Sequence, residues 1–357
     1  MLFWLHNSNK ISIGVGLVLL FALTVIGLGS NYNLRAEENY SNPVLKEEKS
    51  DIGDPSVIKF NDKYYLYATS IPNLGYRVWQ SDNLVDWHEK GLAYDSSLEN
   101  NIWGMGDFWA PEVIRYRGKF FMAFSARAPD GHLKIGLAVS EKPLGPFKNF
   151  KVPLFDRNAS FIDPYIFIAD GGEPYLFYVK DCSENVINGI HTSQIYVQKM
   201  RNDLRGLKGD PILVAEPSQA WETGGEYQWN EGPAVIKHGD KYYLTYSANY
   251  FASKDYSIGY LKASNLLGPW EKFEGNPILS KNNKKDIYGT GGNNFTVSPD
   301  GKELFIVYHS LSDPTSSRVN RVVNIDRIDF QNGRLKVIGP TRSPQPVPSN
   351  DEKYQEK

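Results

Sequence analysis

The sequence predicts an all-β fold, a five-bladed β-propeller in a single domain, and three observations lead to this prediction. A two-part strand pattern recurs five times along the 357-residue chain. Aromatic residues, which suit the pleated surfaces of β-sheets, make up 13% of the sequence. No stretch after residue 30 keeps a sustained helical period. The predicted propeller domain spans residues 45–346 without an internal linker.

The first part of each repeat is a β-hairpin that begins at or beside a proline. Two alternating apolar segments flank a tight turn, such as Asn61-Asp62 in the first copy and Arg117-Gly118 in the second. Phe295 takes the place of the proline in the fifth copy, which is the least regular. The copies span residues 54–70, 110–126, 163–180, 232–248 and 294–310.

The second part of each repeat is a strand, then a serine, a turn that contains leucine, and an aromatic residue. It is clear at residues 78–87, 137–147 and 260–270, and weaker at 197–207 and 322–333. Two hairpins give four antiparallel strands, which is the unit of a propeller blade. An ordinary β-sandwich with chance hairpin similarity is the alternative, and five ordered copies argue against it.

The two ends of the chain differ from the repeats. The segment from Ile11 to Gly29 is almost wholly apolar and is long enough to cross a bilayer as a helix. Residues 1–40 are therefore interpreted as a signal peptide or an N-terminal membrane anchor, and the sequence leaves both open. We expect an exported protein, secreted, periplasmic or anchored, that touches a membrane only through this segment. Residues 347–357 are expected to form a polar tail.

Composition excludes several other classes of protein. The net charge of -2 gives no basic excess for binding nucleic acid. Cys182 is the only cysteine in the sequence, so neither an intrachain disulfide nor a cysteine-based zinc site is possible. A domain of this size can stabilise itself by core burial alone, and we expect a monomer.

Three carboxylates stand at the starts of repeats one, three and four, namely Asp54, Asp163 and Glu231. The first strand of a propeller blade lines the central channel, so these side chains are expected at one mouth of that channel. Asp-Pro alone is a common turn dipeptide and proves little. Cleavage of a glycosidic bond with inversion needs one carboxylic acid and one carboxylate, about 6.5–9.5 Å apart. A third carboxylate can keep the acid protonated by raising its pKa.

Five segments carry a resemblance to a known family, and they occur in the family's order along the chain. They are Asp54-Pro55 before a strand, WAPEVIRYRGKFFMAFS (109–125), FIDPYIF (161–167), NEGPAVIKHGDKYYLTYS (230–247) and GPTRSPQP (339–346). These segments resemble the signatures of glycoside hydrolase family 43 over roughly residues 50–346. The resemblance implies a five-bladed propeller and an inverting O-glycosyl hydrolase that acts on arabinans, xylans or related plant-wall polymers. It implies Asp54 as general base, Glu231 as general acid, and Asp163 as the residue that orients the acid and tunes its pKa.

Within this family we expect an exo-acting α-L-arabinofuranosidase or β-xylosidase with a carbohydrate substrate. Long inserts at residues 88–108 and 181–230 favour a pocket over an open groove. An endo-1,5-α-L-arabinanase and a propeller hydrolase of marine polysaccharide remain alternatives. A sugar-binding propeller without catalysis is the non-enzyme alternative, and it predicts the loss of at least one of the three acids, all of which are present.

Further candidates for substrate binding are aromatic residues and one arginine. Trp109 opens the second repeat, where it can stack on sugar or pack in the core. Arg321 resembles the family's substrate-contacting arginine, with Arg318 as the competitor and a surface arginine as the alternative. The weaker aromatic candidates lie in or near rim loops and are Trp79, Trp103, Phe108, Tyr227 and Trp229.

The fifth repeat departs from the family pattern at one position. Many members carry a histidine there that helps to hold a metal ion or a water on the channel axis, and Gly292 stands in its place. This departure argues against an axial calcium, for which Asn293, Asn294 or His309 would have to substitute. No cofactor is required by the reaction, and no metal ligands are assigned.

Overall fold

The computed structural model describes residues 38–47, 50–99 and 103–350, and these residues form an all-β protein. Five four-stranded antiparallel sheets follow one another along the chain. The predicted all-β class is confirmed. The predicted signal or anchor segment, residues 1–40, lies outside the described residues except for its last three, which include strand β1 (Asn39–Tyr40). Within the described part of the chain, no helix is long and apolar enough to cross a membrane.

Each sheet is a meander of consecutive hairpins. Sheet 1 is β2 (Gly53–Phe60), β3 (Lys63–Thr69), β4 (Gly75–Ser81) and β5 (His88–Asp95). Sheet 2 is β6 (Trp109–Tyr116), β7 (Lys119–Arg127), β8 (Leu133–Ser140) and β9 (Lys148–Lys151). Sheet 3 is β10 (Phe161–Ile168), β11 (Pro174–Lys180), β14 (Gln194–Met200) and β15 (Leu207–Ala215). Sheet 4 is β17 (Asn230–His238), β18 (Lys241–Ala248), β19 (Ser257–Ala263) and β20 (Glu271–Lys272). Sheet 5 is β21 (Gly291–Val297), β22 (Leu304–Leu311), β23 (Arg321–Gln331) and β24 (Arg334–Val337).

The remaining elements are short. A small sheet joins β12 (Val186–Ile187), β13 (Ile190–Thr192) and β16 (Tyr227–Gln228) within the long insert after β11. One 3-10 turn, η1, covers Ser96–Leu98. Near the two ends of the described chain, β1 (Asn39–Tyr40) pairs with β25 (Gln345–Pro346).

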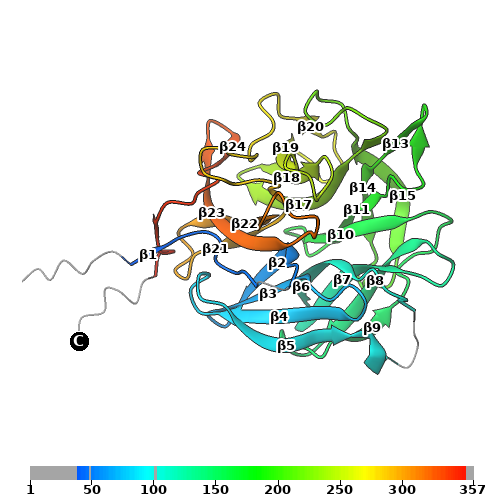
Figure 1. Cartoon of the computed structure of the whole chain (residues 1–357). Helices are drawn as coiled ribbons and strands as arrows, with labels where there is room; N and C mark the ends of the chain where they lie inside the picture. Colours follow the sequence, from blue (N-terminus) through cyan, green and yellow to red (C-terminus); the bar gives the residue numbers. More distant parts are fainter. Residues whose placement is uncertain (1–37, 48–49, 100–102, 351–357) are drawn as a thin grey trace, which may run out of the picture. The chain divides into compact units, whose positions relative to one another are not determined.

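The first strands of the five sheets contact one another in a closed ring. Strand β2 contacts β6 and β21, β10 contacts β6 and β17, and β17 contacts β21. Figure 1 shows β2, β6, β10 and β17 near the middle of the fold, with the last strands of their sheets, β5, β9, β15 and β20, further out. Five clusters of buried hydrophobic side chains fill the spaces between neighbouring sheets. For example, Tyr67 of sheet 1 packs with Phe120 and Met122 of sheet 2.

Every first strand carries a β-bulge near its start. The register of each with its second strand shifts within the first few residues. One residue in each bulge has left-handed backbone torsions, which turn the chain and re-aim its side chain. These residues are Asp54 (φ 50°), Ala110 (φ 44°), Asp163 (φ 51°), Gly232 (φ 57°) and Gly292 (φ 55°).

Candidate active site

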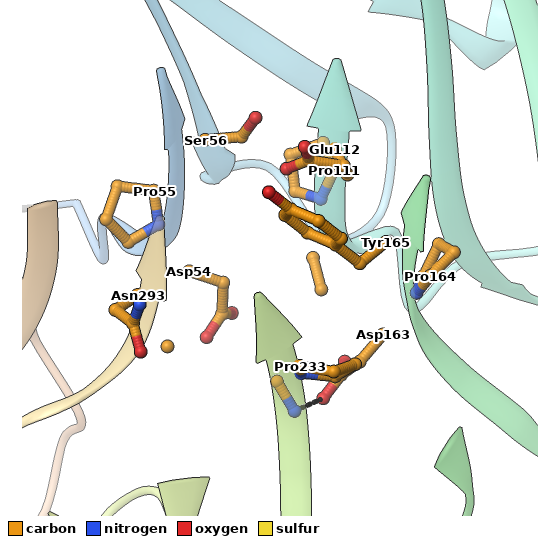
Figure 2. A pocket seen from close by; sticks show the side chains of 13 residues that line it. Asp54, Pro55, Ser56, Pro111, Glu112, Asp163, Pro164, Tyr165, Pro233 and Asn293 are labelled. Carbon is orange, nitrogen blue, oxygen red and sulfur yellow. Dashed lines mark hydrogen bonds between the residues drawn. The ribbon is translucent and has the colours of Figure 1, made fainter. Parts of the chain in front are cut away.

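A pocket lies where the five first strands begin. It is lined by residues of all five, among them Asp54 from β2, Glu112 from β6, Asp163 from β10, Gly232 from β17 and Asn293 from β21. Figure 2 shows the side chains of Asp54 and Asp163, which line this pocket from two different strands. Distant parts of the sequence therefore meet here, as the repeat pattern predicts.

The three predicted catalytic carboxylates do not occupy equivalent positions, which corrects the sequence interpretation. Asp54 and Asp163 are themselves the left-handed residues of their bulges, whereas in sheet 4 that residue is Gly232. Glu231 is the residue before it and is not among those that line the pocket. Its carboxyl group is nevertheless close enough to interact electrostatically with both aspartates.

Hydrogen bonds between neighbouring sheets hold four of the five left-handed residues in place. In each case the backbone N–H of that residue donates to a side chain near the end of the second strand of the preceding sheet. We call these four bonds the latches. They run from Ala110 to Thr69 (2.9 Å), Asp163 to Ser125 (3.0 Å), Gly292 to Ser247 (2.9 Å) and Asp54 to His309 (3.1 Å).

The fifth position of this ring differs. The backbone N–H of Gly232 donates to the Asp163 carboxylate at 2.9 Å, drawn as the dashed line in Figure 2. The residue of sheet 3 at the latch position is Val179, which has no acceptor atom in its side chain. The Asp163 side chain is thereby held by a hydrogen bond from the residue that follows Glu231.

Asp54 is held as an anion. Arg321 donates to both of its carboxylate oxygens, at 3.2 and 3.0 Å, and the Thr69 hydroxyl donates to one of them at 2.8 Å. Burial would raise the pKa of Asp54, but the charge of Arg321 and these hydrogen bonds outweigh it and lower the pKa. An ionised carboxylate at neutral pH is what a general base requires.

Glu231 and Asp163 show the opposite electrostatics. Burial, the charge of Asp163 and other nearby carboxylates raise the pKa of Glu231 well above its ordinary value. Tyr256 donates to Glu231 Oε1 at 2.9 Å, which only partly opposes this. Burial and the charge of Asp54 also raise the pKa of Asp163, to about 7, while the Gly232 N–H lowers it. This pair can retain a proton near neutral pH, and a protonated Glu231 is a competent general acid.

Arg321 is buried, with 4% of its surface exposed, so the surface alternative is wrong. Its guanidinium binds Asp54 and, through Nε and NH2, also Asp51. Gly53 makes room for it, because a Cβ at that position would lie 1.8 Å from the Arg321 Cζ atom. The ring of Phe251 packs at 5.2 Å from the same group. The competitor Arg318 is exposed, and the arginine that pairs with Asp54 is Arg321.

Three of the aromatic candidates are placed in the core, which corrects their prediction as substrate-binding residues. Trp79, Trp103 and Phe108 are 1%, 7% and 0% exposed. Trp79 packs between sheets 1 and 5, and the other two pack between sheets 1 and 2. Large rings near loops turn inward because burial removes their apolar area from water. Trp109 is half-buried at the start of β6, next to Ala110 of the pocket.

Several residues of the site were missed by sequence reasoning. Asp51 and Tyr256 lie outside the repeated hairpins, so no pattern marks them. Glu112 lines the pocket, accepts a hydrogen bond from Asn294 at 3.0 Å, and has a pKa that burial raises to about 8. Its position two residues after the start of the second copy was the available signal.

Gly292 and His309 do not supply the ligand that an axial metal ion would need at the centre of the ring of first strands. A side chain at position 292 would clash, because a Cβ there would lie 2.6 Å from Asp54 Oδ1 and 2.7 Å from His309. The Nδ1 atom of His309 accepts the Asp54 N–H, so the neutral ring carries its proton on Nε2 and cannot ligate a metal there. Within the described residues, no group of three His, Cys, Asp or Glu side chains is arranged to hold a metal.

Comparisons with known proteins agree with this architecture. Residues 40–335 match the glycosyl hydrolases family 43. A crystal structure of a thermostable family-43 glycoside hydrolase is 62% identical, covers 87% of this chain and 100% of its own, and superposes with a TM-score of 0.85. A crystal structure of an endo-1,4-beta-xylanase from Bacteroides thetaiotaomicron is 28% identical, with a TM-score of 0.71 over 85% of this chain and 98% of its own.

Among curated proteins, an extracellular exo-alpha-(1->5)-L-arabinofuranosidase from Streptomyces avermitilis is 29% identical over 84% of this chain. The chain spans 63% of the length of that relative. The match to the family over most of the chain, together with the 62% identity to a family-43 structure, identifies the relationship. The chain belongs to glycoside hydrolase family 43.

Proposed function

We propose that the chain is an inverting glycoside hydrolase whose five sheets are the blades of a five-bladed β-propeller. The observation that carries this proposal is the contrast between two carboxyl groups at one end of the ring of first strands, the partly buried Asp54 and the buried Glu231. Asp54 has a lowered pKa and Glu231 has a raised one, which is the division between base and acid that inversion requires.

In the proposed mechanism, Asp54 accepts a proton from a water molecule as the oxygen of that water attacks the anomeric carbon. Glu231 gives its proton to the glycosidic oxygen as the bond from that oxygen to the anomeric carbon breaks. The attack comes from the face opposite the leaving group, so the configuration inverts. Asp163 contributes charge that keeps Glu231 protonated, and the Gly232 amide holds Asp163 in place. Proton exchange with solvent then restores both carboxyl groups.

The proposed substrate is an arabinose- or xylose-containing plant-wall polysaccharide or oligosaccharide, attacked from its end. The name of the Streptomyces relative supports an arabinofuranosidase, and the name of the Bacteroides enzyme supports xylan as the alternative. The long segment between β11 and β17, which carries the small sheet, supports a walled pocket. Export is supported by the same Streptomyces relative, which is named as extracellular.

We further propose that the leaving-group side of the substrate meets a row of aromatic residues beside Glu231. Alternation along an extended chain puts Tyr227, Trp229 and Glu231 on one face. The rings of Tyr227 and Trp229 are stacked with centroids 5.9 Å apart, and Tyr250 lies 5.7 Å from Trp229. Tyr227 and Tyr250 are 42% and 48% exposed, so this row supplies the rings that the three buried aromatic candidates do not.

We propose one catalytic domain over residues 45–346, preceded by a signal or anchor within residues 1–40 and followed by a polar tail at 347–357. Tyr40 is 4% exposed and β1 pairs with β25, so the folded part begins by Asn39, before the predicted limit at residue 45, and the proposed signal or anchor ends before Asn39. We propose a monomer that needs no cofactor.

The test is hydrolysis of aryl arabinofuranosides, aryl xylosides and debranched arabinan by the purified protein. Proton NMR of the first sugar released should show the anomer opposite to that of the substrate. Retention of configuration would exclude the proposed roles. Hydrolysis of polymer at internal bonds would favour the endo-acting arabinanase, and binding without hydrolysis by the intact protein would favour the non-catalytic propeller.

A further inference from the structure

We propose that Val179 is a positioning residue for the reaction, because its lack of an acceptor reserves the Gly232 amide for Asp163. The inference rests on the proposed function and assigns a new role within the same site. Four of the five sheets supply the acceptor side chain of a latch. Sheet 3 does not, and the Gly232 amide donates to Asp163 instead.

The register of the strands shows that Val179 occupies the latch position of sheet 3. In each sheet, the latch residue is the pairing partner of the residue just before the left-handed one. Val179 pairs with Ile162, which precedes Asp163. The equivalent pairs are Gly53 with Thr69, Trp109 with Ser125, Glu231 with Ser247 and Gly291 with His309.

Packing shows that the Val179 side chain faces the sheet that carries Gly232. Val179 is fully buried in the cluster that also holds Val235 and Leu244 of sheet 4. Its neighbours along the strand, Leu176 and Tyr178, belong instead to the cluster between sheets 2 and 3. A hydroxyl on this side chain would therefore be placed as the Thr69 hydroxyl is placed toward Ala110.

The consequence is electrostatic. The Gly232 N–H stabilises the ionised form of Asp163, and the charge of Asp163 holds the proton on Glu231. The other groups that face this pair are Asp54, Asp181, Arg321 and Tyr256. Of these groups and the Gly232 amide, it is the amide that donates a hydrogen bond to the Asp163 carboxylate, and this bond lowers the pKa of Asp163. Loss of the amide would favour the arrangement in which Asp163 holds the proton and Glu231 has none to give.

The test is Val179→Thr, which keeps the shape of the side chain and adds one hydroxyl, with Val179→Ala as the control that adds no acceptor. We expect the introduced threonine hydroxyl to capture the Gly232 amide. Protonation of Asp163 then becomes easier, so the acid limb of kcat/KM against pH moves up by roughly one unit and the maximum falls about tenfold. Val179→Ala should keep the wild-type position of that limb. Val179→Ser provides the same hydroxyl if the threonine variant does not fold.

A second readout needs no activity and separates this inference from the proposed function. Labelling the full chain with carbonyl-13C glutamate and 15N glycine selects only two amides, Gly232 and Gly275, because Glu-Gly occurs twice in the sequence. In the wild-type protein the Gly232 amide proton should shift as Asp163 titrates, and in Val179→Thr it should not. Gly275 serves as the internal reference. Equal pH dependence of the Gly232 signal in both proteins, or an equal shift of the acid limb in Val179→Ala, would overturn the role of Val179.

Discussion

At the scale of single residues, the carboxyl groups of the site differ in the side chains that surround them. Asp54 meets a buried guanidinium and one threonine hydroxyl that donate to it, whereas Glu231 meets one tyrosine hydroxyl and other acids. The difference begins in the backbone. Asp54 is the left-handed residue of its bulge and Glu231 precedes one, so the two side chains leave their strands from different positions.

Replacing Arg321 with glutamine should move the acid limb of activity to higher pH. The charge of Arg321 lowers the pKa of Asp54, and a base must be ionised, so its loss lets Asp54 take up a proton at higher pH. The variant also leaves Asp51 and Asp54 partly buried without their cation, which should destabilise the fold by about 3 kcal/mol. Initial rates against pH and denaturant unfolding measure the two effects.

The pH dependence of stability in the wild-type protein follows from the same pair. The folded pKa of Asp54 is depressed, so its contribution is present above the unfolded pKa and is lost as pH falls through the folded value. The stability that the wild type holds over Arg321→Gln should therefore shrink as the pH falls from neutral through the acid range. A difference between the two proteins that stays constant across that range would contradict the assignment.

Replacing Asp163 with asparagine should move the alkaline limb of activity to lower pH. The charge of Asp163 raises the pKa of Glu231, and an acid must keep its proton, so a neutral asparagine at this position lets Glu231 ionise earlier. The asparagine oxygen can still accept the Gly232 N–H, which keeps the backbone in place. A pH profile of kcat/KM decides the matter, and an alkaline limb at the wild-type pH would contradict the role of Asp163.

The three acids could be predicted from the sequence because each of them stands at the start of a recognisable repeat. It missed Asp51 and Tyr256, since a single carboxylate or tyrosine outside the repeats carries no pattern. It placed Trp79, Trp103 and Phe108 wrongly because proximity to a loop in the sequence does not say which way a ring turns. Their burial depends on which sheets pack together, and no local signal encodes this.

At the scale of elements, the first strands are joined by hydrogen bonds from the backbone of one sheet to a side chain of its neighbour. The hairpins of the repeats were predictable from alternation and turns, including the degenerate fifth copy at β21 and β22. The bulges were not, since left-handed torsions fall on Asp, Ala and Gly alike. The latch residues are Thr, Ser, Ser and His, so no single residue type marks them in the sequence.

Removing one latch should weaken the fold measurably. Ser247→Ala leaves the buried Gly292 N–H without its acceptor, which should lower the free energy of unfolding by about 1–3 kcal/mol. The matched control is Ser264→Ala on the surface beside the same sheet, where a change below about 0.5 kcal/mol is expected. Urea unfolding of the two variants gives the comparison, and equal stabilities would contradict the latch.

At the scale of the whole molecule, the segment before β2 ties the start of the described chain to sheet 5. Asn42 donates to the Ile325 carbonyl at 2.8 Å and accepts the Ile325 N–H at 2.9 Å, and its amide also contacts Thr341. Asn42→Ala should lower the free energy of unfolding by about 2–3 kcal/mol without moving either limb of the pH profile. Urea unfolding measures the stability and a pH profile of kcat/KM measures the two limbs. A shift of either limb would show that the contact of Asn42 with sheet 5 also affects the active site.

The division of roles between Glu231 and Asp54 is tested most directly by the leaving group of the substrate. The measurement is kcat/KM of Glu231→Ala and Asp54→Ala on a dinitrophenyl glycoside, whose leaving group needs no proton, and on the matching methyl glycoside, whose leaving group does. Glu231→Ala should lose about a hundredfold or more on the methyl glycoside and little on the dinitrophenyl one, and Asp54→Ala should lose heavily on both. Equal losses of Glu231→Ala on both substrates, or wild-type rates for Asp54→Ala, would contradict the account.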